Sequence, residues 1–148
     1  MIITWGKPKI EYAKTVEEGT EPTVYKEMPT QEEDSVQLTT NPATAKELFG
    51  EGHELVARQE LKPTYVLTMD VFIDKGDDRP IETVDGVIDD TYAVKLTPEA
   101  AGGKGFLFKS SQVSAEELWS SAKGSVVRYT FTALKPKAGN TFTVGDTW

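Results

Sequence analysis

One alternating run of side chains constrains the fold of this chain more than any other feature of its sequence. Every second residue from Tyr65 to Ile73 is apolar, whereas Thr68 and Asp70 interrupt the other face. A period of two is the spacing of a β-strand, and one apolar face is typical of a strand that is half-buried in an antiparallel sheet. The chain must therefore build a sheet whose one face covers a core.

A second strand is expected at Val126–Ala133, where the alternation returns. The segment Glu117–Ala122 precedes it, and Lys123-Gly124 lies between them. A short connection that contains glycine between two alternating runs indicates a hairpin. The positions that we expect in the core of these strands are Leu67, Met69, Val71, Val127, Tyr129 and Phe131.

Weaker patterns extend the strand interpretation over the whole chain. They are Ile2–Trp5, Ile10–Tyr12, Thr23–Met28, Val36–Thr39, Glu54–Gln59, Tyr92–Leu96 and Phe106–Ser111. All prolines fall between the runs, as strand interiors require. The sequence therefore predicts an all-β fold, an antiparallel sandwich or barrel with long loops and at most one short helix. Its 148 residues suit a single domain spanning 1–148.

Two segments are ambiguous between helix and strand. Asn41–Gly50 carries a capping residue, a proline at the first helical position and a closing glycine, yet its side chains also alternate as in a strand. Ser114–Glu117 has the residues that begin a helical turn, although the hairpin downstream favours a strand.

Two long polar loops are expected, at Glu27–Ser35 and Asp74–Asp90. Loops of this length are uncommon in compact domains and are often functional. Because both segments are rich in charge, we interpret them as surface elements that contribute nothing to the core.

The sequence holds few of the residues that catalysis or metal binding requires. It has no cysteine and one histidine, which excludes a disulfide framework, a thiolate zinc site and a cysteine nucleophile. Acidic turns at 74–78 and 85–90 lack the EF-hand spacing for calcium. A glycosidase needs two carboxylates at one glycosidic bond. Neighbouring residues on a strand face opposite sides of the sheet, so the adjacent pairs do not supply this arrangement if they lie on strands; they are Glu32-Glu33, Asp89-Asp90 and Glu116-Glu117. We predict no catalytic, metal or cofactor-binding residue, no cofactor and no enzyme.

The remaining residues of chemical interest have simple structural interpretations. His53 lies in a glycine-flanked turn and is expected on the surface. Gly102–Gly105 lacks the spacing of a phosphate loop and is interpreted as a turn between strands. Trp5 and Trp119 lie in strand patterns, which favours the core, whereas Trp148 is the last residue. A sugar-binding platform made of these tryptophans is the open alternative.

The charge distribution bears on partners. Residues 1–100 hold 21 acidic and 10 basic side chains, whereas residues 101–148 hold 3 acidic and 6 basic ones. An acidic body repels a phosphate backbone, so specific nucleic-acid binding is not expected. The opposite signs of the two parts permit head-to-tail attraction between like molecules, although an unevenly charged solvated surface is the simpler interpretation.

No membrane segment is expected. Met1–Lys9 has too short an apolar stretch for a signal peptide and no basic segment before it. No apolar run approaches the roughly 18–20 residues that a membrane span needs. We therefore expect the protein to be made in a cytoplasm and to stay there.

Several segments, taken in order, resemble the tail tube subunits of long-tailed bacteriophages. They are Tyr25–Thr40, Tyr65–Ile73, Arg79–Pro98, Glu117–Gly124 and Tyr129–Gly139. The similarity spans residues 20–140, and it consists of structural patterns rather than a catalytic signature.

The resemblance implies a β-sandwich or barrel whose copies form hexameric rings, which stack into a hollow tube for DNA. The type VI secretion tube shares this architecture. The expected partners are copies of the same chain and other tail proteins, with DNA as non-specific cargo in the lumen and no membrane. The expected location is the virion tail, after synthesis in a bacterial cytoplasm. The alternative is a monomeric β-sandwich that binds carbohydrate or protein.

Within such an assembly, we expect the loops Glu27–Ser35 and Asp74–Asp90 at subunit or ring contacts. Their carboxylates would repel one another across a stack unless basic side chains formed ion pairs with them. The candidate cations are Lys104, Lys109, Lys123, Lys135 and Lys137.

Overall fold

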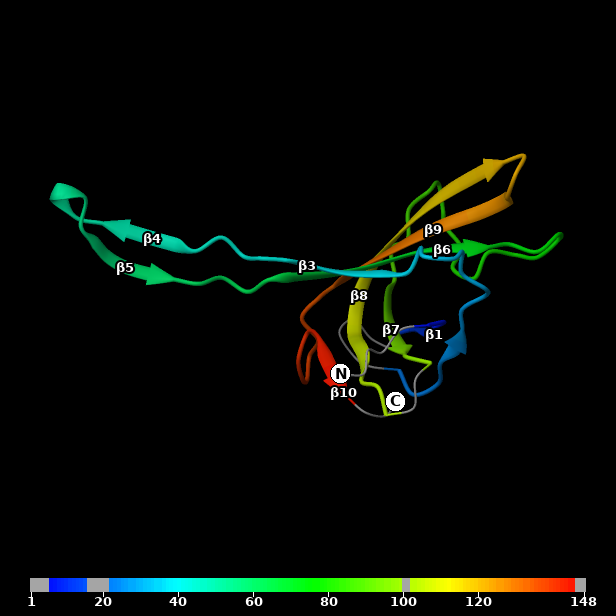
Figure 1. Ribbon diagram of the computed structural model, residues 1–148, viewed down its shortest axis with the longest axis horizontal. Coiled ribbons are helices and arrows are strands. Elements are labelled where there is room, and N and C mark those ends of the chain that lie inside the picture. The colour runs from blue at the N-terminus through cyan, green and yellow to red at the C-terminus, as the bar shows by residue number, and fades with distance from the viewer. Residues whose placement is uncertain (1–5, 16–21, 100–101, 146–148) are drawn as a thin grey trace.

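The computed structural model describes residues 6–15, 22–99 and 102–145, and nearly all of its regular secondary structure is antiparallel strand. Figure 1 shows a strand-built body from which one long ribbon projects. The strands are β1 (Lys9–Lys14), β2 (Lys26–Glu27), β3 (Gln37–Asn41), β4 (Lys46–Phe49), β5 (Leu55–Gln59), β6 (Thr64–Phe72), β7 (Thr91–Thr97), β8 (Gly105–Ser120), β9 (Gly124–Ala133) and β10 (Thr143–Gly145). The prediction of an all-β antiparallel fold is confirmed.

The body is one sheet in the order β2-β1-β7-β8-β9-β6-β3, with β10 added beside β8. Strand β8 organises it because its two halves have different neighbours. Its first half pairs with β7 and β10, and its second half pairs with β9 from Ser111↔Ala133 to Ser120↔Gly124. A register shift opposite Ala93 puts one extra residue into β8, and such bulges bend a strand.

The segment that follows β2 connects β1 and β6, which lie near opposite edges of this sheet. The Met28 N–H donates to the Ile10 carbonyl at 2.8 Å, and the Phe72 N–H donates to the Thr30 carbonyl at 2.9 Å. The Glu32 N–H donates to the Asp70 carbonyl at 2.8 Å. Backbone hydrogen bonds therefore join this one segment to β1 on one side and to β6 on the other, which curls the sheet toward a barrel.

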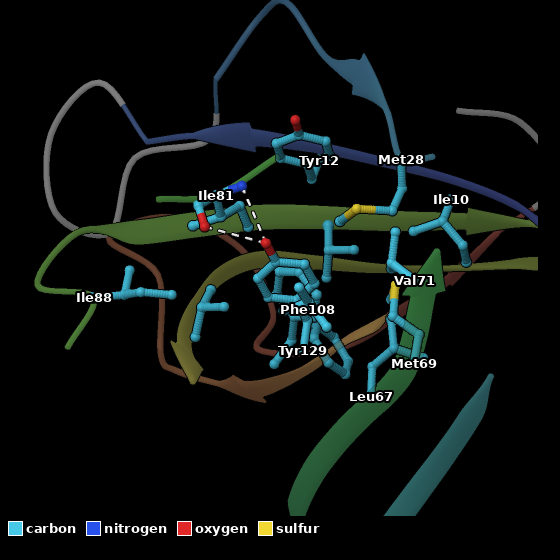
Figure 2. Close-up of a cluster of buried hydrophobic side chains, with 14 residues drawn as sticks. Ile10, Tyr12, Met28, Leu67, Met69, Val71, Ile81, Ile88, Phe108 and Tyr129 are labelled. Atoms are coloured by element: carbon cyan, nitrogen blue, oxygen red, sulfur yellow. Dashed lines mark hydrogen bonds between the residues drawn. The ribbon is translucent and has the colours of Figure 1, made fainter. Parts of the chain in front are cut away.

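The core lies inside this curl and follows the alternation of the sequence. All six residues expected in the core are buried: Leu67, Met69, Val71, Val127, Tyr129 and Phe131. Figure 2 shows Tyr129 and Phe108 among aliphatic side chains from several strands. A fully buried side chain of this size contributes about 1.5–3 kcal/mol through the hydrophobic effect, so this cluster stabilises the curl.

The expected hairpin at Lys123-Gly124 is confirmed, because β8 and β9 pair up to Ser120↔Gly124. Gly124 has a φ of +75°, a left-handed conformation that glycine adopts without strain. The segments Phe106–Ser111 and Glu117–Ala122 were expected as separate strands, but β8 runs through both and ends at Ser120. Ser114–Glu117 is therefore strand and not a helical turn.

Three other expectations need correction or qualification. The helix considered for Asn41–Gly50 is absent: Lys46–Phe49 is strand β4, paired with β5. The one helical element in the described part of the chain is a 3-10 turn at Glu51–His53. Of the strand expected at Thr23–Met28, only Lys26–Glu27 forms, and Ile2–Trp5 lies outside the described residues.

Both long loops exist, but they are not purely surface elements. Met28 on the first loop is buried, as are Ile81 and Ile88 on the second. The polar residues of each loop surround one or two apolar residues that enter the core, and the composition of the segment hides this. No helix in the part of the chain that the structure describes is long and apolar enough to cross a membrane.

Candidate functional site

The ribbon formed by β4 and β5 projects from the body as an arm, which we define as residues 42–63. Its strands continue from β3 and β6, whose last registered pair is Asn41↔Thr64. With about 3.3 Å per strand residue, the eight residues from Asn41 to Phe49 carry the tip roughly 26 Å beyond this pair. Figure 1 shows the arm extending away from the rest of the molecule.

The arm has one charged face and several exposed apolar side chains. On the charged face, Arg58 Nε donates to Glu47 Oε1 at 3.2 Å, and Arg58 Nη1 donates to Glu60 Oε1 at 3.1 Å. Leu48 and Ala57 form the next registered pair and therefore face the opposite side. The large apolar side chains that the arm exposes are Leu48, Phe49, Leu55, Val56 and Leu61.

The arm tip, which we define as residues 49–54, combines an aromatic stack with acidic residues. The Phe49 and His53 rings stack with centroids 4.7 Å apart and an angle of 5° between their planes. Glu51 begins the 3-10 turn and Glu54 follows it. His53 is exposed, as the sequence predicted.

A second feature is the strap, which we define as residues 74–90. It is anchored at Tyr129, whose hydroxyl donates to the Ile81 carbonyl at 3.1 Å and accepts from the Ile81 N–H at 3.3 Å (Figure 2). Burial raises the pKa of Tyr129 to about 12. The neutral phenol is thus held as a fixed hydrogen-bonding partner of the strap.

An ion pair on the surface also holds the strap. Arg79 Nε lies 2.8 Å from Glu117 Oε1, and Arg79 Nη2 lies 3.1 Å from Glu117 Oε2. The hydrogen bond from this guanidinium lowers the pKa of Glu117. β8 has no strand partner on its β7 side beyond Gln112 among the described residues, so the strap lies beside an otherwise open edge. Covering an edge in this way limits unwanted strand pairing.

The turn of the β8–β9 hairpin carries a third feature, a hollow of about 420 Å³. Its lining includes the paired residues Leu118 and Val126 and, from the next position on β8, Trp119. Trp119 is 75% exposed, so the expectation that it belongs to the core is wrong. The alternation is real, but β8 runs past the end of the core, and Trp119 lies on that overhang. Trp5 and Trp148 lie outside the described residues.

The outer face of the central strands is polar and almost free of unpaired charge. Three registered rows cross it: Gln37, Thr68, Thr130 and Ser114; Thr39, Val66, Thr132 and Gln112; and Asp70, Arg128 and Glu116. Arg128 Nε and Nη2 donate to Asp70 Oδ1 and Oδ2 at 2.8 and 3.3 Å. Glu116 lies 3.9 Å from the same guanidinium, so this face holds its cation between two carboxylates.

The adjacent carboxylates Glu116 and Glu117 behave as their strand position predicts. Glu116 faces Arg128 and Glu117 faces Arg79, so the two do not converge on one point. Within the described ranges, no group of three or more His, Asp or Glu side chains is arranged to hold a metal ion. The glycines Gly102 and Gly103 lie between β7 and β8, where a turn was expected.

The candidate cations of the last third are mostly engaged within the chain. Lys123 forms an ion pair with Glu32, and Lys135 Nζ donates to the Gly139 carbonyl at 3.1 Å. Lys104, Lys109 and Lys137 each have an interaction of their own. The ion pair that was expected between Lys123 and a loop carboxylate of another copy therefore forms within one molecule, with Glu32 of the first long loop.

Comparison of the chain with protein-family models finds no match, and no curated protein matches it significantly.

Proposed function

We propose that this chain is the structural subunit of a phage or prophage tail tube, which assembles into hexameric rings that stack into a hollow conduit for DNA. The observation that carries the proposal is the arm. An isolated two-stranded ribbon is at best marginally stable in water, and all of β4 and β5 is exposed. A surface outside the chain is therefore needed to support it.

The apolar residues of the arm supply the affinity for such a surface. Phe49 is 50% exposed and Val56 is 69% exposed. Fully burying a side chain of this kind contributes about 1.5–3 kcal/mol. A contact that covers the exposed half of four such side chains therefore contributes on the order of 4 kcal/mol to binding. The surface ion pairs of the arm contribute about 0–1 kcal/mol each. Hydrophobic contact therefore dominates, and charge sets alignment.

The position of the arm favours open-ended assembly. It leaves the sheet at the Thr64 end of β6, whereas the exposed Trp119 lies on the hairpin near the other end of that strand. Figure 1 shows the arm and the β8–β9 turn on opposite sides of the molecule. When two copies make a contact between two different surfaces, each uses one of its two surfaces and keeps the other, so further copies can add and build closed rings or growing stacks.

The polar outer face suits the wall of a DNA conduit. Its hydroxyl and amide side chains offer no fixed charge, and Arg128 is held by Asp70. Affinity for DNA depends on cations that neutralise phosphates. A wall of this composition lets DNA pass as non-specific cargo without retaining it.

The test is to weaken the arm without touching the body. We expect Leu48→Ser with Val56→Ser to abolish assembly, followed by light scattering and electron microscopy, while the far-ultraviolet circular dichroism spectrum stays that of the wild type. Val24→Ser is the matched control, because Val24 is 77% exposed and lies outside the arm. Wild-type assembly by the double variant would contradict the role of the arm.

A second candidate is a monomeric binding module for carbohydrate or protein, and the exposed Trp119 favours it. Tryptophan is enriched among the residues that dominate binding energy at interfaces. This alternative predicts a chain that stays monomeric at every concentration and binds its ligand through Trp119, so the oligomeric state separates the two proposals.

A further inference from the structure

We propose that the cavity between the strap and the β8–β9 hairpin, together with the Trp119 ring beside it, binds a neutral saccharide. This cavity, which we call the strap cavity, has a volume of about 260 Å³. Its lining includes Arg79, Ile81 and Thr83 from the strap and Glu117, Val127 and Tyr129 from the hairpin. The inference goes beyond the proposed function and does not depend on assembly, because one copy of the chain supplies the whole site.

The strand register places Trp119 on the side of the hairpin that faces the strap cavity. Residues two apart on a strand share a face, so Trp119 lies on the same face of β8 as Glu117. Across the hairpin, Glu117 pairs with Val127 and Trp119 pairs with Ser125, and both Glu117 and Val127 line the cavity. Trp119 is 75% exposed, so its ring is open to a ligand that extends out of the cavity.

The polar groups of the strap cavity offer hydrogen bonds to a ligand. Arg79 and Glu117 are joined by two contacts, of 2.8 and 3.1 Å, and their side chains are 35% and 58% exposed. A guanidinium has five N–H donors and an ionised carboxylate has about four acceptor positions. The pair therefore has donors and acceptors beyond those that join its two members. Thr83 lines the same cavity, and a threonine hydroxyl both donates and accepts.

These groups favour a neutral ligand that is rich in hydroxyls. The charges of Arg79 and Glu117 compensate each other, so the pair gives no net attraction to a charged ligand. An apolar side chain of a partner protein would displace water from the pair without replacing its hydrogen bonds, which costs free energy. A saccharide avoids that cost, because adjacent hydroxyls of one ring can hydrogen-bond to a carboxylate and a guanidinium. The C–H face of a sugar ring also packs well on an indole ring.

The dimensions of the site favour an oligosaccharide. The cavity is smaller than the roughly 300–1,000 Å³ of pockets that enclose drug-sized ligands, so it suits one sugar ring. With about 3.3 Å per strand residue, the Cα of Trp119 lies roughly 7 Å beyond the Cα of Glu117. Trp119 is thus placed to contact the next ring of a chain whose first ring occupies the cavity.

The test measures saccharide binding to dilute protein, so that assembly does not interfere. The probes are tetrasaccharides of glucose, galactose, mannose and N-acetylglucosamine, each titrated to millimolar concentration and followed by saturation-transfer NMR and tryptophan fluorescence. We expect at least one of them to bind the wild-type chain. Trp119→Ala should weaken that binding about tenfold or more and leave the urea midpoint unchanged, whereas Trp119→Tyr, which keeps an aromatic ring, should retain most of it.

Two further variants show whether the binding uses this site. Leu118→Ala is the matched control, because Leu118 is the neighbour of Trp119 on the opposite face of β8, and we expect it to bind as the wild type does. Thr83→Val removes a hydroxyl from the cavity without touching the ion pair and should weaken binding severalfold.

The outcomes separate this inference from the proposed function. Binding of none of the four tetrasaccharides, or an equal loss in Leu118→Ala and Trp119→Ala, would overturn the inference and leave the proposed function standing. A chain that binds a saccharide through Trp119 and never assembles would support the inference and refute the proposed function.

Discussion

Removing the Tyr129 hydroxyl tests how the strap is held to the body. In Tyr129→Phe the ring stays in the core, but the Ile81 carbonyl loses its donor at 3.1 Å and the Ile81 N–H loses its acceptor at 3.3 Å. Ile81 is buried, so water does not replace the hydroxyl unless the strap moves outward. The substitution therefore changes the hydrogen bonding of the strap and little else.

The expected magnitude follows from these two groups. A buried polar group without a partner costs about 1–3 kcal/mol, and a net hydrogen bond contributes about 0.5–1.5 kcal/mol. Because the phenylalanine ring keeps the apolar contacts, we expect the free energy of unfolding to fall by about 2–3 kcal/mol. Outward movement of the strap would lower the loss toward about 1 kcal/mol, since hydration would then replace the lost bonds.

Urea unfolding of dilute protein, followed by fluorescence, measures this loss as a lower midpoint at constant slope. Tyr65→Phe is the matched control, because Tyr65 is partly buried and packs its ring on Phe142 with centroids 4.4 Å apart. We expect the control to change the free energy of unfolding by less than about 0.5 kcal/mol. Equal midpoints for Tyr129→Phe and wild type would refute the view that this hydroxyl anchors the strap.

Three further predictions concern the core and the titrating groups. Phe131→Ala should lower the free energy of unfolding by about 3–5 kcal/mol, because Phe131 is fully buried; a loss below about 1 kcal/mol in urea unfolding would contradict its place in the core. The pKa of Glu117 lies below its ordinary value of 4.5, so its pairing stabilises the fold above that pH and the contribution is lost as the pH falls through the lowered value. Glu117→Gln should therefore flatten the acid limb of stability against pH, and an unchanged limb would argue against the pair. The pKa of Tyr129 is raised from 10.0 to about 12, so its neutral form stabilises the fold below pH 10 and this contribution is lost as the pH rises toward 12. Tyr129→Phe should reduce the alkaline loss of stability between those limits, and urea midpoints that fall as steeply as those of the wild type would count against it.

The sequence predicted the central strands well because burial and alternation coincide there. Leu67, Met69 and Val71 face the core, and Thr68 and Asp70 face outward, as a period of two requires. The β8–β9 hairpin was predictable for a related reason: Gly124 supplies the left-handed residue at the turn. In both places a local signal and the tertiary structure favour the same conformation.

The arm was not predictable as an arm, because its local signals conflict. The helix punctuation of Asn41 and Pro42 is genuine, but pairing with β5 decides the conformation, and the partner strand lies beyond the turn. Nothing in the alternation around Leu48 shows that neither face meets the core. The sequence signal that was available is the placement of apolar residues on both sides of a glycine-rich turn, with prolines at 42 and 63 marking the ends.

Trp119 also shows that alternation alone does not predict burial. Its strand pattern is correct, but alternation reports the face on which a residue lies and not whether the strand still covers the core at that point. The loops show the converse, since Ile81 and Ile88 are core residues inside a segment whose average composition is polar. The contact role expected for both loops remains a prediction. Deletion of residues 29–35 would be a poor test of it, because Thr30 and Glu32 hydrogen-bond to β6.

The central claim is that copies of this chain assemble with one another into rings and tubes. Electron microscopy of the purified protein, from dilute solution up to millimolar concentration and in the presence of its tail initiator, tests that claim most directly. The account predicts monomers when the protein is dilute, and six-fold rings and hollow tubes when it is concentrated or initiated. A strictly monomeric protein under all of these conditions would contradict the account and favour the binding module.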